Sequence, residues 1–185
     1  MNLVARVKGI LTNPRAEWAA IDNEPLNLSE VLTGYVLPLA AIGPIAMIIG
    51  WSAFGVGGFF RLSMGWIISH AILQYILTVA GIFVLAWVIN ALAPTFGATQ
   101  SMPQAIKVAV YSSTAAWVAA IFNIIPMLAF VAIIGAIYSL YLFWIGLPML
   151  MKPPADRAAT YAIVVIIACV IVFMIIGAIS TRSMF

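Results

Sequence analysis

Long apolar runs, interrupted by short polar segments, are the dominant pattern along this chain. The runs are free of charged residues, which are absent between Glu30 and Arg61, Arg61 and Lys107, Lys107 and Lys152, and Arg157 and Arg182. About 20 apolar residues cross the roughly 30 Å hydrocarbon core of a bilayer as an α-helix. The runs do not alternate with period two, as membrane β-strands do. The pattern therefore predicts an all-α integral membrane bundle.

Five transmembrane helices are predicted from these runs. They cover residues 33–53, 65–93, 106–125, 127–151 and 160–181, within a membrane domain of residues 31–185. The second run is longer than a bilayer requires, so we expect it to tilt or protrude. Residues 123–126 must turn the chain, because a single helix over residues 108–151 would be about 66 Å long.

Residues 1–30 precede the membrane domain and follow a different pattern. Apolar side chains recur on one helical face at Leu3, Val4, Val7, Ile10 and Leu11. Such an amphipathic segment is typical of a helix that lies flat at the membrane interface. Further helix starts are predicted at Asn13-Pro14 and Asn27, and Trp18 is expected at headgroup depth. The segment is either a docking platform for a cytoplasmic partner or an anchor for the first span.

Composition and charge agree with a membrane protein and add an orientation. The 185 residues are 65% hydrophobic and 7% charged, whereas soluble domains carry about 25% charged residues. Lysine and arginine collect in cytoplasmic loops. An N-terminus inside the cell puts six basic residues in the cytoplasm and only Arg61 and Arg182 outside; the six are Arg6, Lys8, Arg15, Lys107, Lys152 and Arg157. The predicted orientation is N-terminus inside and C-terminus outside.

Polar residues recur on single faces of the second and third spans. His70, Gln74 and Thr78 are spaced by four residues, and Ser112 and Asn123 lie on one face of the next span. One interpretation is a polar path between the spans, because intramembrane ionisable groups usually mark function. The other is hydrogen-bonded packing, since helices in lipid approach one another through small and polar residues. The small-residue faces also favour self-association.

Motifs for catalysis, metal binding and nucleic-acid binding are not found in the sequence. It contains no His-Glu-x-x-His, Gly-x-Ser-x-Gly or Walker sequence, and no carboxylate inside a predicted span. The lone Cys169 lies in mid-span, and the basic residues do not cluster with aromatic ones. We therefore expect a protein that is not an enzyme and has no cofactor, no metal site and no nucleic-acid partner.

A helix-breaking sequence lies near the end of the fourth span. Pro148 removes a backbone donor, and its ring clashes with the carbonyl of the residue four positions earlier. Such a break is tolerated near the interface, where water or a neighbouring helix satisfies the freed group. Gly146-Leu147-Pro148 therefore indicates either a bend at the cytoplasmic mouth of the bundle or a plain helix end, with Lys152 at the headgroups.

Several short pieces resemble the bacterial branch of the Yip (Ypt/Rab-interacting) membrane protein family. They are Asn13-Pro14 with Trp18, Gly34-Tyr35-Val36-Leu37-Pro38-Leu39, Ala93-Pro94-Thr95-Phe96-Gly97, and Tyr138-Ser139-Leu140 with Gly146-Leu147-Pro148 and Met151. The resemblance implies five spans, a cytoplasmic N-terminus and the bacterial cytoplasmic (inner) membrane. Eukaryotic members bind prenylated Rab GTPases, associate with one another and shape early secretory membranes. Their Asp-Leu-Tyr-Gly-Pro stretch is absent here, so we expect a different partner.

The function expected from these features is that of a non-enzymatic membrane scaffold or adaptor. Its expected partners are the lipid bilayer, a membrane or cytoplasmic protein, and a second copy of the chain. The residues expected to form the cytoplasmic, partner-binding face are Trp18, Tyr35, Pro38, Gly146, Leu147, Pro148 and Lys152. The alternative is a small transporter, channel or lipid-translocating protein that uses the polar seam of His70, Gln74, Thr78, Ser112 and Asn123.

Overall fold

The computed structural model describes residues 2–55 and 61–182, and every regular element among them is helical. The N-terminal elements are α1 (Leu3–Thr12) and α2 (Pro14–Asn23). The bundle then consists of α3 (Leu28–Val31), η1 (Leu32–Val36), α4 (Leu37–Ala40), α5 (Ile42–Phe54), α6 (Met64–Leu92), η2 (Ala93–Phe96), α7 (Met102–Ser112), α8 (Thr114–Ala119), η3 (Ala120–Ile124), η4 (Pro126–Leu128), α9 (Ala129–Met151) and α10 (Ala155–Arg182).

Four helical segments are long and apolar enough to cross a membrane. They are Leu28–Phe54, Met64–Phe96, Met102–Ile124 and Phe130–Met151. The first starts earlier than residue 33 because the Asn27 side chain accepts a hydrogen bond from the Glu30 backbone N–H and so begins the helix there. The fifth predicted span falls within α10, a 28-residue helix, and its crossing of the membrane stays a prediction.

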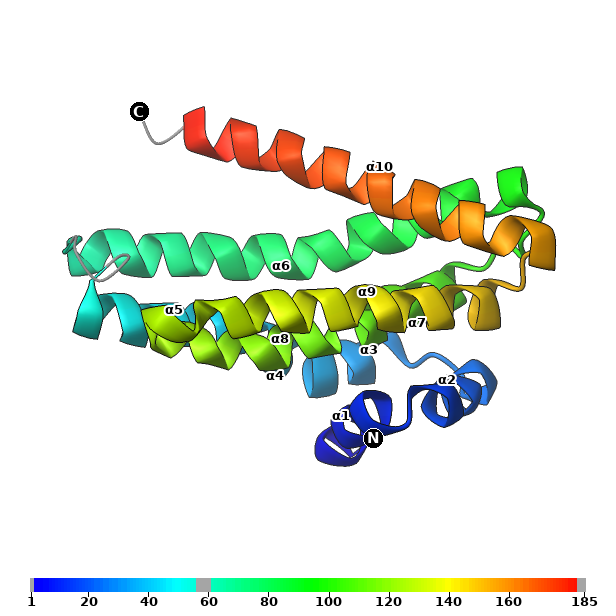
Figure 1. Ribbon diagram of the computed structural model, residues 1–185, viewed down its shortest axis with the longest axis horizontal. Helices are drawn as coiled ribbons and strands as arrows, with labels where there is room; N and C mark the ends of the chain where they lie inside the picture. The colour runs from blue at the N-terminus through cyan, green and yellow to red at the C-terminus, as the bar shows by residue number, and fades with distance from the viewer. Residues whose placement is uncertain (1, 56–60, 183–185) are drawn as a thin grey trace.

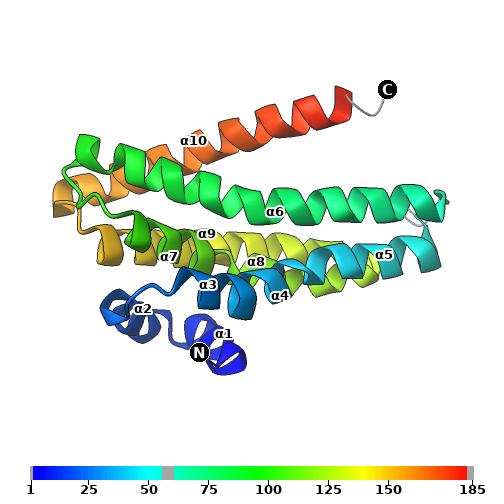
Figure 2. The same ribbon diagram turned by 180° about the vertical axis from the view of Figure 1, so that it is seen from behind.

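The long helices run side by side, with α10 at one side of the bundle (Figure 1). The segment Met102–Ile124 is the most deeply buried and packs against α6, α9 and α5. Towards its C-terminal end α10 moves away from α6, as both views show (Figures 1 and 2). We call the end of the bundle where α7 begins and α9 ends the hairpin end.

The connection between the third and fourth spans is the turn that the sequence requires. The helix gives way to the short 3₁₀ elements η3 and η4, and α9 then runs back along α8. The prediction of a reversal near residues 123–126 is confirmed. The fourth span continues as α-helix through Pro148 to Met151 and ends at Lys152, whose φ of 51° is left-handed.

Candidate functional site

Helices α1 and α2 form a compact unit beside the bundle, with α2 nearer to the hairpin end (Figure 1). In both views α1 is seen nearly end-on while the long helices run across the page (Figures 1 and 2). The unit therefore lies across the bundle axis, which is the orientation of an interfacial helix. We call residues 2–26, which include both helices and the segment after them, the platform.

The apolar face of the platform packs on the bundle. Ile10, Trp18 and Ile21 are fully or almost fully buried, and Val7 packs against the same core. Val4 is the exception, with 74% of its surface exposed. The predicted amphipathic pattern is present, but its apolar stripe contacts protein over most of its length.

Trp18 is the largest side chain in this contact. Its indole ring lies directly over Gly146 of α9, where a Cβ atom would collide with three ring atoms. The edge of the ring meets Tyr111 of α7, with centroids 6.3 Å apart. Leu147 is fully buried beside Gly146. Gly146 is therefore required for close packing between α2 and α9.

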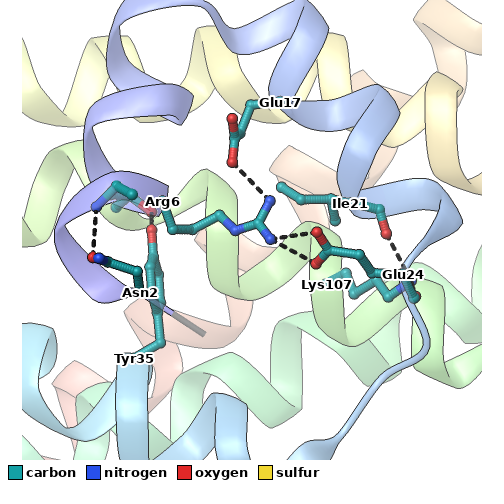
Figure 3. Close-up of polar contacts among 9 residues, drawn as sticks. Asn2, Arg6, Glu17, Ile21, Glu24, Tyr35 and Lys107 are labelled. Atoms are coloured by element: carbon teal, nitrogen blue, oxygen red, sulfur yellow. Dashed lines mark hydrogen bonds and ion pairs between the residues drawn. The ribbon is translucent and has the colours of Figure 1, made fainter.

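The C-terminal end of α2 is held by polar side chains of the bundle. The buried Lys107 ammonium donates hydrogen bonds to the carbonyl oxygens of Ile21 (2.8 Å) and Glu24 (2.5 Å), as Figure 3 shows in part. Gln104 Nε2 donates to Asp22 Oδ1 at 2.8 Å, and Lys152 Nζ lies 3.1 Å from Asp22 Oδ2. A cation suits this position because the last carbonyls of a helix carry partial negative charge. We call Gln104, Lys107 and Lys152 the α2 clamp.

Arg6 joins α1 to α2 and to the segment after it (Figure 3). Its Nη1 donates to Glu17 Oε1 at 2.7 Å, and its Nη2 donates to both carboxylate oxygens of Glu24 at 2.5 and 2.6 Å. The guanidinium also lies over the Tyr111 ring, 5.7 Å from the centroid. Burial lowers the pKa of Arg6, but the hydrogen bond and charge of Glu24 and the charge of Glu17 raise it above its ordinary value. Arg6 is therefore a permanent positive charge within the platform.

Beneath the platform, Tyr35 anchors the start of the first span. Its hydroxyl lies 2.7 Å from Thr114 Oγ1, and the Thr114 hydroxyl donates in turn to the Tyr111 carbonyl. Tyr35 is therefore the donor to Thr114. A second tyrosine, Tyr138 of α9, donates to the carbonyl of Leu11 at the end of α1. The first contact joins the first span to α8, and the second joins the platform to α9.

The residues predicted to face a partner differ in burial. Trp18, Tyr35, Gly146 and Leu147 are buried, Pro148 is partly buried, and Pro38 and Lys152 are exposed. The structure thus brings Trp18, Gly146, Leu147 and Lys152 together at one contact, which joins the platform to the bundle. The buried members hold the platform in place from within and are not available at the surface.

The polar seam is not assembled in the structure. His70 stacks on Trp66 and Trp51, with centroids 4.9 and 5.8 Å away. Ser112 instead lines a small cavity with Leu85, and Leu85 lies fifteen residues after His70, about 22 Å further along the helix.

The other seam residues differ in burial and position. Gln74 is exposed and Thr78 is partly buried. The carbonyl of Asn123 faces Gly50 of α5, where a Cβ would lie only 2.6 Å from it. The spans therefore pack through separate local contacts.

Sequence reasoning missed the residues that fix the platform. The sequence assigns Arg6 and Lys107 to a side of the membrane and gives no role to Asp22, Glu24 and Gln104. Lys107 carried a usable signal, because a lone cation near the start of an apolar helix needs a buried partner. Its partners are backbone carbonyls 83 and 86 residues away, which no local pattern identifies. Within residues 2–55 and 61–182, no three His, Cys, Asp or Glu side chains gather as a metal site.

Comparison with known proteins gives one family. The family model described as Yip1 domain matches residues 8–176. The chain is also 26% identical over 167 residues to "Inner membrane protein YohC" of Escherichia coli strain K12, covering 86% of this chain and 85% of that protein. The protein of the same name in Escherichia coli O6:H1 strain CFT073 matches equally. No solved structure shows significant similarity to the chain.

Proposed function

We propose, on the premise that this chain belongs to the Yip1 domain family, that it is a non-enzymatic scaffold of the inner membrane. Its partner would be a cytoplasmic or membrane protein that binds the outward surface of the platform. The observation that carries this proposal is the α2 clamp, with Arg6 beside it. These charged and polar groups position a short helix on the bundle, and no chemical step is needed to explain their arrangement.

The outward face of α2 supports a protein partner. It exposes Arg15, Ala16, Ala19, Ala20 and Asn23. Small side chains on one helical face let another backbone approach closely, and a fixed helix loses little conformational entropy on binding. The acids Glu17, Asp22 and Glu24 are paired within the protein, so Arg15 gives this face a positive charge. A partner with a complementary acidic residue would be favoured.

The test is site-specific photo-crosslinking in native membranes. A photoreactive amino acid at position 16, 19 or 20 should give one recurring protein adduct that mass spectrometry identifies. The matched control at Leu62, which is exposed at the opposite end of the bundle, should not give it. A Lys107→Met variant should lose the adduct, because the helix is no longer held. If the three α2 positions give no adduct, the platform is not the binding surface.

A transport assay tests the alternative function, in which the protein moves a solute or lipid. Purified protein in liposomes is expected to show no solute or lipid flux. In the crosslinking experiment, the His70→Ala variant is expected to give the same adduct as wild type. Flux that disappears in His70→Ala would contradict the scaffold proposal, because it would make the His70 region a path rather than a packing contact.

A further inference from the structure

The third span is interrupted at Ser113, which lies between α7 and α8. The first backbone N–H groups of a helix have no acceptor within the helix, and the Ser113 side chain does not cap α8. The Ala116 N–H, at the third position of α8, instead donates to Ser139 Oγ of α9 at 2.9 Å. The two helices approach closely because Gly135, one turn earlier on α9, has no Cβ to collide with Ala119. A serine of the fourth span therefore caps the second half of the third.

A cavity lies beside this interruption, between α6, α7, α9 and α10. Its volume is about 220 Å³, and most of its wall is apolar. An engineered apolar cavity of about 150 Å³ holds benzene, so by proportion this one holds about nine non-hydrogen atoms. No charged side chain is among the described residues of its wall. The wall includes Leu85, Ser112, Ser113, Ser139, Phe143 and Cys169.

Three serine hydroxyls supply the polar part of the wall. The Ser112 and Ser113 hydroxyls both donate to the carbonyl oxygen of Ala109, at 3.4 and 2.8 Å, and keep lone pairs that can accept. Ser139 Oγ accepts from the Ala116 N–H, but its own O–H donates to no acceptor in the described part of the chain. One free donor and two free acceptors therefore border the same apolar cavity.

The cavity opens towards the surroundings of the bundle at Leu140 and Val170. Both residues line it, and each has 50% of its surface exposed. Leu140 belongs to the candidate span Phe130–Met151, so its exposed surface meets lipid. A molecule dissolved in the bilayer can therefore enter here without passing through the platform.

We propose that this cavity binds a small neutral alcohol or phenol. The ligand hydroxyl accepts from the Ser139 O–H and donates to the Oγ of Ser112 or Ser113, and its hydrocarbon part packs against Leu85 and Phe143. A pure hydrocarbon would leave the Ser139 donor without a bond in apolar surroundings, which is costly. A carboxylate or ammonium would meet no opposite charge on the described wall. The site is independent of the platform and of its proposed partner.

The experiment is photo-labelling of the full-length protein in liposomes with 1-hexanol that carries a diazirine. Mass spectrometry should find adducts on the cavity wall, at Phe143 or Cys169. The same diazirine on hexane, at equal concentration in the bilayer, should label these positions about ten-fold less, because it lacks the hydrogen bonds. Excess unmodified hexanol should suppress the labelling, and excess hexanoate should not.

Three variants locate the binding. Ser139→Ala should lower the labelling of Phe143 by hexanol about ten-fold. Because this variant also removes the acceptor of the Ala116 N–H, Cys169→Phe is the second test: it fills the cavity, keeps the cap and should abolish labelling of the wall. Ser52→Ala is the matched control and should behave as wild type, since the Ser52 hydroxyl is exposed on α5 and donates within its own helix.

Two results would overturn the proposal by showing that the hydroxyl is not recognised. They are equal labelling of the wall by the two probes, as expected of a gap that takes any hydrocarbon, and no adduct on the wall, as expected if water alone occupies it. Labelling that persists in Cys169→Phe would place the ligand elsewhere and overturn it as well. The protein adduct at positions 16, 19 and 20 should not change with hexanol, so failure of either proposal is visible separately.

Discussion

The Trp18 indole packs directly on Gly146 because glycine has no side chain. The ring covers the Cα of Gly146, and the rest of the indole is enclosed by the bundle. Removing an apolar surface of this size from water or the headgroup region stabilises the docked platform. A single methyl group at position 146 would compete directly with that contact.

Gly146→Ala should therefore loosen the platform. Overpacking of a well-filled contact costs about 1–3 kcal/mol. Hydrogen exchange of the α2 backbone amides, followed by mass spectrometry, should accelerate about ten-fold for each 1.4 kcal/mol lost. Gly65→Ala is the control, since nothing lies within 4 Å of a Cβ at that glycine. Equal exchange in Gly146→Ala and wild type would show that the indole can move without releasing α2.

Lys107 holds the end of α2 through the hydrogen bonds of its ammonium group. Lys107→Met keeps the length of the side chain but leaves the carbonyls of Ile21 and Glu24 without this donor. Leaving buried acceptors unsatisfied costs about 1–3 kcal/mol. We expect faster exchange at the end of α2 with the transmembrane helices unaffected. Lys8→Met, a substitution of an exposed residue, should leave the exchange rates unchanged.

At the scale of elements, the sequence predicts the helices better than it predicts what they touch. The Asn13-Pro14 start of α2 and the Asn27 cap of α3 are where local chemistry places them. An apolar stripe looks the same whether lipid or protein covers it, so the periodicity of α1 could not identify α9 as its neighbour. The contacts that decide this, such as Tyr138 with Leu11, join residues 127 positions apart.

The α1–α2 pair should show energetic coupling between Arg6 and Glu17. Their side chains are only 11% and 23% exposed, and Gly9 leaves the space in which the Glu17 carboxylate lies. A double-mutant cycle of Arg6→Met and Glu17→Gln, measured by local hydrogen exchange of α1, should give a coupling energy of about 1 kcal/mol. Strictly additive effects would mean that the apolar face alone holds the two helices together.

At the scale of the whole molecule, span length and charge-free runs locate four membrane helices and the turn between the third and fourth. They cannot locate α10 relative to α6, because apolar residues in lipid pack equally well against helices and acyl chains. The same ambiguity explains why the sequence does not establish which helix faces the residues of the polar seam. Spacing by four residues places His70 and Gln74 on one face, but which helix faces them depends on crossings that are set by contacts distant in sequence.

The orientation of the whole chain is predicted from the charges at its hairpin end. Lys152 and Arg157 lie there, next to the end of α2, and Arg61 lies at the other end of α6. Because basic segments are retained in the cytoplasm, the hairpin end should face inside. In a Cys169→Ala background, a membrane-impermeant maleimide applied to intact cells should label Arg61→Cys and leave Lys8→Cys unlabelled. Permeabilised cells should label both.

A C-terminal reporter completes this test, because it depends on α10 crossing the membrane. With five crossings and the hairpin end inside, a C-terminal alkaline phosphatase fusion should be active and a C-terminal green fluorescent protein fusion should be dark. The reverse pattern with the same maleimide result would mean that α10 returns to the cytoplasmic side and that the chain crosses four times. In that case the open face of α6 would border lipid along its whole length.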